Sequence, residues 1–423
     1  MATLTALILL LLLIAAGIHI SISLGIVAVT LMLFNFAVPP AIVAQIAWSS
    51  VDKYSLAAIP FFIFAGNLMS RGQLALVMLD LFGTVLRSIR GGVAVGLALA
   101  AVFFAAVNGS SVACAAALGP SAVKILPREG YTPPFAAAVV AVFGTLGLMI
   151  PPSLTFILIG SIVGLPITDL FIAGIIPGLM EAVLLTGMTL YLSRMRGYGN
   201  LTQRPDWQGF ARRLPRASGA CLMPVIVIGT IYAGLFTPTE VSALVAIYAL
   251  FLVLIVYRTA SLSDVWDTTR TSLLQSVMIY AILMGAGLLT GLLTRLGFTN
   301  EIAAFLNISE MPLWVFLLAV NLLLLVIGMF LDGVSMIVLL SPIVFPLAME
   351  VGVDPIHMAV IMTAQVEIAT LTPPIGLNLF VMSRVSGVPV HSITKAIIPF
   401  YGMRIFALLL LNAFPQISLY LVK

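Results

Sequence analysis

The sequence is short of charge. Only 8% of its 423 residues are Asp, Glu, Lys or Arg, 62% are hydrophobic, and the mean hydropathy is +1.21. A water-soluble domain carries roughly 25% charged residues, because its surface has to be hydrated. The composition therefore excludes a cytoplasmic enzyme, a nucleic-acid-binding protein and a disordered chain. It predicts an all-α polytopic protein in contact with membrane lipid, since helices satisfy their own backbone groups in a bilayer.

Residues that build metal and redox sites are also scarce. The two cysteines, Cys114 and Cys221, form no CxxC motif, and the three histidines match no ligand spacing. We therefore expect no disulfide, no transition metal, no cofactor and no catalytic centre. No Lys or Arg precedes Lys53, so the apolar run 4–34 lacks the basic start of a cleaved signal peptide. This run predicts a retained first helix, tilted or broken near 17–19.

The most strongly charged segment is basic. Residues 194–216 contain six arginines and a single acid, Asp206. Short basic segments beside membrane helices stay on the cytoplasmic side. We interpret 194–216 as a cytoplasmic loop between two halves of the chain.

Proline marks an internal repeat. At a constant offset of 222 residues, Pro120 aligns with Pro342, Gly130 with Gly352, Pro133 with Pro355, Pro151-Pro152 with Pro373-Pro374 and Pro177 with Pro399. Such co-linear matches indicate a duplication. The turn at 124–131 is basic and its equivalent at 348–355 is acidic, so the positive-inside rule places the two turns on opposite sides of the membrane. Inverted repeats of this kind are typical of secondary transporters.

The repeat divides the chain into five parts: an N-terminal scaffold helix and interfacial segment (1–56), the first repeat (57–193), the basic loop (194–216), linking scaffold helices (217–279) and the second repeat (280–423). In each repeat a short apolar stretch that begins at polar residues predicts a re-entrant hairpin. The two hairpins are expected at about 108–126 and about 332–350. A Pro-Pro pair then breaks the following helix, at 151–152 and at 373–374.

The two Pro-Pro breaks predict a binding site. Proline has no N–H, so carbonyls one turn earlier lose their helical partner. Irregular backbone at membrane depth is tolerated where it lines a site. Free carbonyls suit a cation, and helix N-termini suit an anion. One break alone would equally fit a simple kink, whereas two breaks at matched positions favour a site for cations and an anionic substrate.

Charged residues inside apolar segments are candidates for function. Asp332 aligns with Ser110 at the hairpin tips, where it would bind a cation or orient its tip. The alternative for Asp332 is a structural hydrogen bond. Arg384 would bind a carboxylate substrate or extend to the membrane interface, and both readings stay open. For Glu181, Glu240 and Glu367, structural pairing is the favoured reading.

Four stretches resemble a known family: GTLGLMIPPS (144–153), DLFIAGIIPG (169–178), GLFTPTE (234–240) and LTPPIGLNLF (371–380). Over essentially its whole length the chain resembles the large membrane subunit of the tripartite ATP-independent periplasmic (TRAP) transporters. The resemblance implies an elevator-type transporter like those of the ion-transporter superfamily, in the bacterial inner membrane. It implies a small four-helix membrane subunit and a soluble periplasmic substrate-binding protein as partners. It also implies sodium-driven uptake of small organic acids, such as dicarboxylates, keto acids, sugar acids or sialic acid.

The resemblance further implies two sodium sites built mostly from backbone oxygens. The first would comprise Asn108, Gly147, Ile150 and Pro152, and the second Gly328, Ala369, Thr372 and Ile375. Many family members have Ser at the position of Asn108 and Gly at that of Ala369, changes that a backbone ligand tolerates. The candidate tip or substrate residues are Ser110, Ser111, Ser153, Asp332, Asn378 and Arg384. The alternative function is an ion or water channel built from re-entrant half-helices, which would need a continuous lined pore.

Overall fold

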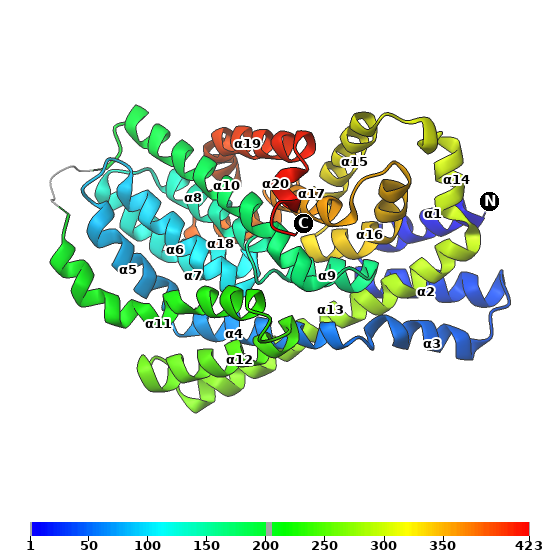
Figure 1. Ribbon diagram of the computed structural model, residues 1–423, viewed down its shortest axis with the longest axis horizontal. Coiled ribbons are helices and arrows are strands. Elements are labelled where there is room, and N and C mark those ends of the chain that lie inside the picture. The colour runs from blue at the N-terminus through cyan, green and yellow to red at the C-terminus, as the bar shows by residue number, and fades with distance from the viewer. Residues whose placement is uncertain (1, 200–204, 423) are drawn as a thin grey trace.

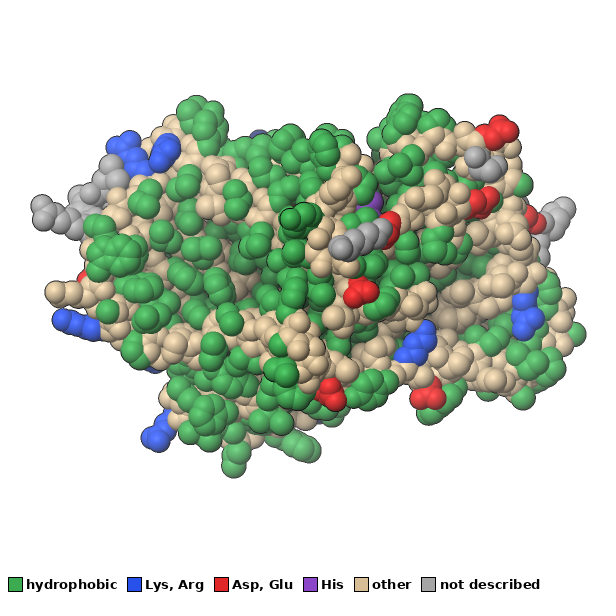
Figure 2. All heavy atoms as spheres, viewed as in Figure 1, with side chains coloured by type: hydrophobic (Ala, Val, Ile, Leu, Met, Phe, Trp, Pro, Cys, Tyr) green, Lys and Arg blue, Asp and Glu red, His purple; other side chains and the backbone are tan. Residues whose placement is uncertain are grey.

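The structure is a computed structural model that describes residues 2–199 and 205–422. Over these two ranges it is helical, without strands, and apolar side chains cover most of the face seen in Figure 2. Six of the described helices are long and apolar enough to cross a membrane, and the bent pair α4 and α5 would make a seventh span. The predicted all-α polytopic membrane fold is confirmed.

One layer contains helices from both ends of the first 300 residues: α1 (Ala2–Ala15), α2 (Ile20–Phe34), α3 (Pro40–Val51), α4 (Ala58–Arg71), α12 (Pro238–Phe251) and α13 (Leu262–Leu296). The long helix α13 packs against α2, α3 and α4, and α4 also packs against α12. Figure 1 shows α13 running beside α2 and α3 on one side of the molecule. We call these helices the α13 layer.

The second body contains the remaining helices of the first repeat together with the linking helix α11, and the helices of the second repeat that follow α13. The first set is α5 (Leu74–Leu86), α6 (Gly92–Asn108), α7 (Ser111–Ile125), α8 (Pro133–Thr145), α9 (Leu154–Val163), α10 (Ile167–Met195) and α11 (Trp207–Tyr232). The second set is α14 (Phe298–Phe305), α15 (Leu313–Gly328), α16 (Gly333–Glu350), α17 (Pro355–Ala369), α18 (Leu377–Ser386), α19 (Val390–Ala413) and α20 (Gln416–Leu419).

The contacts between these two sets are themselves repeated. The offset of 222 residues relates α7 to α16, α8 to α17, α9 to α18 and α10 to α19. In space α7 packs against α18 and α9 against α16, while α8 packs against α19 and α10 against α17. Exchanging the two copies converts each of these contacts into its counterpart. The duplication therefore buries helices of one copy against helices of the other.

Two predicted segments differ from the structure at their ends. A third, the apolar run 4–34, takes the broken form expected near 17–19: it is divided at 16–19, where Gly17 has a φ of +79°, and forms two short helices that contact each other. The predicted loop 194–216 is too long, because α11 already begins at Trp207. Asp206 caps that helix by accepting from the Gly209 N–H at 2.7 Å, and arginine is a good helix former. Arg204 lies outside the described residues.

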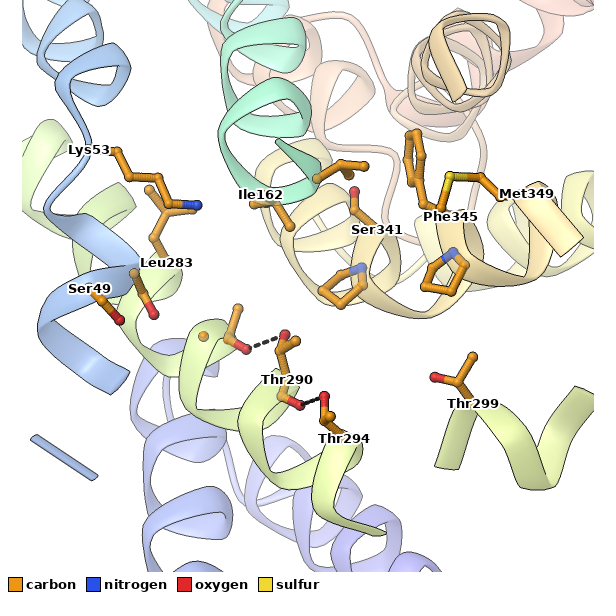
Figure 3. Close-up of a pocket in the computed structure, with 16 residues that line it drawn as sticks. Ser49, Lys53, Ile162, Leu283, Thr290, Thr294, Thr299, Ser341, Phe345 and Met349 are labelled. Carbon is orange, nitrogen blue, oxygen red and sulfur yellow. Dashed lines mark hydrogen bonds between the residues drawn. The ribbon is translucent and has the colours of Figure 1, made fainter. Parts of the chain in front are cut away.

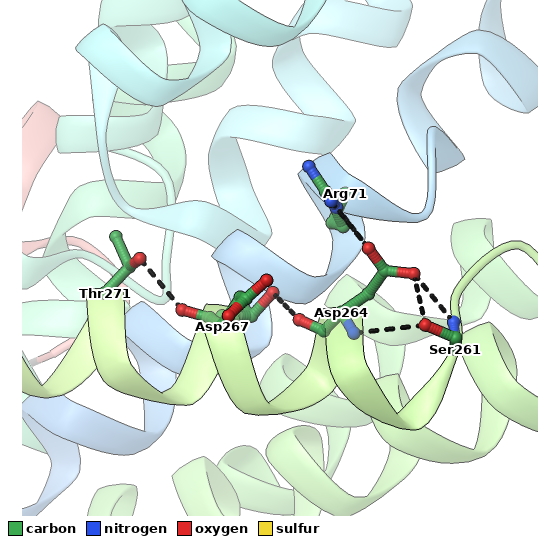
Figure 4. Close-up of polar contacts among 6 residues, drawn as sticks. Arg71, Ser261, Asp264, Asp267 and Thr271 are labelled. Atoms are coloured by element: carbon green, nitrogen blue, oxygen red, sulfur yellow. Dashed lines mark hydrogen bonds and ion pairs between the residues drawn. The ribbon is translucent and has the colours of Figure 1, made fainter.

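The second difference is α13, which begins at Leu262 and continues to Leu296, across the boundary drawn at 279/280 between the linking helices and the second repeat. Polar residues in the first turns hide this helix from a hydropathy reading. Ser261 and Asp264 form a capping box, in which each side chain bonds the other residue's N–H. Arg71 at the end of α4 then pairs with Asp264 at 2.6 Å (Figure 4). The start of α13 is thereby tied to α4.

Candidate functional site

In each repeat a short non-helical tip joins two consecutive helices. The first tip is Gly109-Ser110, between α6 and α7, and the Ser110 hydroxyl accepts from the Ala113 N–H at 3.3 Å. The second tip is 329–332, between α15 and α16, and Asp332 accepts from the N–H groups of Val334 and Ser335 at 3.1 and 3.2 Å. The equivalent residues Ser110 and Asp332 are thus equivalent helix caps, as their aligned positions suggest.

The two Pro-Pro breaks separate α8 from α9 and α17 from α18. In the first break Ser153 caps α9 by accepting from the Phe156 N–H at 3.3 Å, and it donates to the Leu148 carbonyl. In the second break the Thr372 hydroxyl donates to the Ile368 carbonyl at 2.8 Å. The hydroxyl of Tyr401 lies 3.2 Å from the Thr372 hydroxyl and also reaches the Leu371 carbonyl. Tyr401 is a neighbour of this break that the sequence reading missed.

Each tip packs against the Pro-Pro break of its own repeat. Gly147 packs so closely on α6 that a side chain there would overlap the Ala105 carbonyl. A side chain on Gly109 would lie 3.3 Å from the Pro152 carbonyl. The structure therefore places Gly147 against α6, the helix that ends at Asn108, and Pro152 against the first tip.

Residues of the second predicted sodium group make comparable contacts. A side chain on Gly328 would overlap the side chain of Ala369. The N–H of Ile375 donates to the carbonyl of Met329 in the second tip, with an N···O distance of 3.3 Å. Thr372 lies in the same break. The two breaks differ in exposure, since Pro151 and Pro152 are buried whereas Pro373, Pro374 and Ile375 are exposed.

A cavity of about 520 Å³ lies between the two tips, and we call it the tip cavity. Of the predicted site residues it is lined by Asn108, Ser110, Ser111 and Asp332. The α13 layer closes it with Ile63 and Asn67 of α4 and with Gln275, Met278, Ile279 and Ile282 of α13. Asp332 is the one charged residue in this lining. The cavity is therefore shared between the second body and the α13 layer.

Other predicted residues lie outside the tip cavity. The predicted backbone ligands Gly147, Ile150, Pro152, Gly328, Ala369, Thr372 and Ile375 and the cap Ser153 are not in its lining. Arg384 is exposed in the last turn of α18 and is also absent from the lining. Asn378 is fully buried, and among the described residues its amide has no hydrogen-bond partner. The Asn108 amide nitrogen is unpartnered there as well.

Two amides on the α13 layer were missed in the sequence. Asn67 of α4 donates to Gln275 of α13 at 2.8 Å and to Ser272 at 2.9 Å. Both amides interrupt apolar runs, FFIFAGNLM and SLLQSVMIY, and polar residues within such runs tend to be functional. The sequence therefore indicates both amides, but the candidates chosen within apolar segments were charged residues only.

Helix α13 also lines two further cavities. One of about 490 Å³, the Arg71 cavity, lies at its start and has only polar residues in its lining, including Asn67, Arg71, Asp267 and Thr271. The other, of about 560 Å³, lies toward the end of α13 and includes Lys53, Thr290 and Thr294 (Figure 3). Three cavities thus follow one another along one helix. Asn67 belongs to both the Arg71 cavity and the tip cavity.

A buried charge cluster joins the two repeats. Arg404 of α19 is 1% exposed and pairs with Glu181 of α10 and Glu367 of α17. It also donates to the Thr145 hydroxyl and to the Val142 carbonyl, both on α8. The predicted structural pairing of Glu181 and Glu367 therefore has Arg404 as its partner, which the sequence reading did not identify.

Glu240 has a separate structural role. Its carboxylate accepts from the N–H of Thr237 at 2.8 Å and completes a capping box at the start of α12. Structural pairing is thus observed for this third carboxylate as well.

Comparison with known proteins identifies the family. Residues 7–417 match the family described as "Tripartite ATP-independent periplasmic transporter, DctM component". The chain belongs to this family. It is 36% identical over 397 residues to the C4-dicarboxylate TRAP transporter large permease protein DctM of Pseudomonas aeruginosa, covering 93% of this chain and 91% of that protein. The predicted resemblance to the large TRAP membrane subunit is confirmed, and the chain is a multi-pass permease subunit.

Relatives within the TRAP family have different substrates. The chain is 33% identical over 379 residues to the sialic acid TRAP transporter large permease protein SiaM of Vibrio cholerae, covering 89% of this chain and 88% of that protein. Its fold resembles the crystal structure of the YdaH transporter of Alcanivorax borkumensis, with a TM-score of 0.60 over 88% of this chain and 86% of that one. At 15% identity this second likeness concerns the fold alone.

Proposed function

We propose that this TRAP subunit is the transport subunit of a sodium-coupled importer of small organic acids in the bacterial inner membrane. The observation that carries the proposal is the tip cavity, where two helix N-termini from opposite repeats meet beside two Pro-Pro breaks. Secondary transporters bind substrate between such broken helices. The cavity lies between the second body and the α13 layer, so movement of one against the other would expose it alternately, as in an elevator.

The donor set at the breaks suits sodium. Hard cations prefer oxygen ligands, and each break offers backbone carbonyls next to prolines that supply no N–H. Asn108 ends α6 and Asn378 lies in the first turn of α18, both buried. Among the described residues the Asn108 amide nitrogen and both amide atoms of Asn378 have no hydrogen-bond partner. Their amide oxygens would complete the carbonyl sets around the first and second tip, respectively.

An anionic substrate fits the first tip better than the second. At the second tip the Asp332 carboxylate already occupies the N-terminus of α16. At the first tip the uncharged Ser110 caps α7, and the residues of the first turn line the cavity. Helix N-termini attract anions through their free N–H groups and the helix dipole. We therefore expect the carboxylate group of the substrate at the start of α7.

The alternative function, an ion or water channel, needs a continuous polar pore. Between Gln275 and Thr290 the cavity-lining residues of α13 are Met278, Ile279, Ile282, Leu283, Ala286 and Gly287. All six are apolar, so α13 offers no continuous polar lining from the tip cavity to the cavity at Lys53, which favours the transporter.

Uptake should depend on three proteins. We expect this chain alone to give no sodium-dependent uptake of organic acid in proteoliposomes. Adding a small TRAP membrane subunit and a periplasmic substrate-binding protein should restore uptake that requires an inward sodium gradient. The measurement is accumulation of radiolabelled acids, with a potassium gradient as the control. Robust uptake by the isolated chain would contradict the proposal.

The charge pattern predicts the topology. A reporter in 200–210 and a cysteine label beside Arg128 should both face the cytoplasm, because both segments are basic. A label between Glu350 and Asp354 should face the periplasm. Labelling of intact cells and of inverted vesicles with a membrane-impermeant maleimide measures this. Labels at Arg128 and at 350–354 on one side would contradict the inverted repeat.

A further inference from the structure

A cavity of about 560 Å³ away from the tips has a single charged residue in its lining, Lys53. We call it the Lys53 cavity. Its walls come from five helices, since α3, α9, α13, α14 and α16 all contribute residues. Figure 3 shows Lys53 on one side, Thr290 and Thr294 of α13 below, and Ser341 of α16 opposite. A charged group surrounded by apolar and hydroxyl-bearing walls focuses its field on the space between them.

Lys53 extends from just beyond α3 toward α9. Its ammonium donates to the carbonyl of Ser161, which leaves further N–H donors for another partner. Partial burial lowers the pKa of Lys53, because the charged form loses hydration. The neighbouring acid, Asp52, accepts from the Trp48 ring nitrogen at 3.2 Å and is not part of the lining. The cavity therefore has a positive charge with no carboxylate in its walls.

Hydroxyl groups supply further donors. Thr290 donates to the Ala286 carbonyl and Thr294 to the Thr290 carbonyl, each at 2.8 Å (Figure 3). Both carbonyls lie inside α13, where they also accept a helical N–H. Each hydroxyl can therefore turn its hydrogen into the cavity without leaving a carbonyl unpaired.

We propose that the Lys53 cavity is a second anion site that binds a small organic carboxylate, with the Lys53 ammonium as its cationic partner. Its size lies within the range of pockets for small ligands. The binding itself rests on this cavity alone. Its place on the substrate route, at the other end of α13 from the Arg71 cavity, rests on the proposed function. A carboxylate bound in the Lys53 cavity would lie beside α13. In the proposed elevator motion the second body moves along this same helix.

Charge-selective labelling tests the site directly. Thr290→Cys is made in a Cys221→Ser background, where the remaining Cys114 is fully buried and unreactive. The chain is reconstituted with the small membrane subunit in nanodiscs of phosphatidylcholine. The rates of modification by an anionic and by a cationic methanethiosulfonate reagent are then compared. Lys53→Gln should lower the ratio of anionic to cationic rate by roughly tenfold, as expected for one unit charge several ångströms away in water.

Matched variants separate this effect from a change in structure. Lys53→Arg should keep the original ratio, because it keeps the charge. Thr271→Cys in the Arg71 cavity should give a ratio that Lys53→Gln does not change. Succinate should slow modification of Thr290→Cys in the Lys53 protein and not in Lys53→Gln, whereas succinamide, which has no charge, should not slow it.

Two results would overturn the proposal. A rate ratio that is the same with Lys53 and with Gln would mean that no anion is attracted to this cavity. Protection by phosphatidylglycerol in the nanodisc, without protection by succinate, would mean that a lipid headgroup occupies it. Neither result depends on transport, so an intact charge selectivity in a chain without sodium-driven uptake would reject the proposed function and leave this site standing.

Discussion

Arg404→Met is expected to prevent stable folding of the chain. The substitution removes the cation between Glu181 and Glu367 and leaves two carboxylates facing each other in the interior. Breaking a buried ion pair by removing one partner costs about 3–5 kcal/mol. We expect the detergent-solubilised protein to aggregate, or to unfold at a clearly lower temperature, in size-exclusion chromatography and thermal unfolding.

A triple variant separates charge from packing. Arg404→Met combined with Glu181→Gln and Glu367→Gln removes all three charges at similar volume, and it should recover most of the lost stability. The matched control is Arg213→Met, because Arg213 and its partner Asp80 are both largely exposed. An exposed pair contributes about 0–1 kcal/mol, so this variant should unfold like the parent. If Arg404→Met is as stable as the triple variant, pairing of the two carboxylates with Arg404 does not stabilise the association of the two repeats.

Adding one methyl group at either close approach between a tip and its break should strongly raise the sodium concentration that uptake requires. In Gly147→Ala the new side chain would overlap the backbone of Ala105, which cannot move without shifting α6. In Gly328→Ala it would overlap Ala369 and lie 2.6 Å from the Met336 sulfur. Overpacking of this kind costs about 1–3 kcal/mol. Each tip would be displaced from the carbonyls of its break, where we propose that sodium binds.

The readout is the sodium concentration for half-maximal uptake by the reconstituted three-protein system. A loss of 1.4 kcal/mol or more raises it at least about tenfold. Gly187→Ala is the control, because the new side chain would have no atom within 4 Å and alanine favours the helix. Normal sodium dependence in both Gly147→Ala and Gly328→Ala would remove the predicted sodium sites from the tips.

The sequence predicts features that depend on local chemistry. Proline cannot donate a backbone hydrogen bond, so the sequence alone predicts helix breaks at 151–152 and 373–374. The matched positions of these breaks also indicate the repeat. The alignment of Ser110 with Asp332 at the two tips was likewise found from the sequence, whereas their roles as helix caps come from the structure. Each of these features depends on the chemistry of a few residues that are adjacent in the chain.

Features that depend on pairing across the fold were missed. Arg404 lies 223 residues from Glu181, and its role appears only when α10 and α19 are placed together. Lys53 was read as part of an interfacial segment, because no local pattern connects it to hydroxyls on α13. Asn67 and Gln275 lie 208 residues apart. Each is an amide within an apolar run, which indicates a functional role, but the residues around it do not indicate its hydrogen-bond partner.

The charge cluster also has a consequence for the order in which the chain is made. The second repeat contains both Glu367 and Arg404, whereas the first contributes Glu181 without a cation. During synthesis Glu181 leaves the ribosome long before Arg404, and burying it unpaired would be costly. The Glu181 carboxylate therefore gains its cationic partner only when α19 packs against α10. The last long helix of the chain completes a charge cluster that the first repeat began.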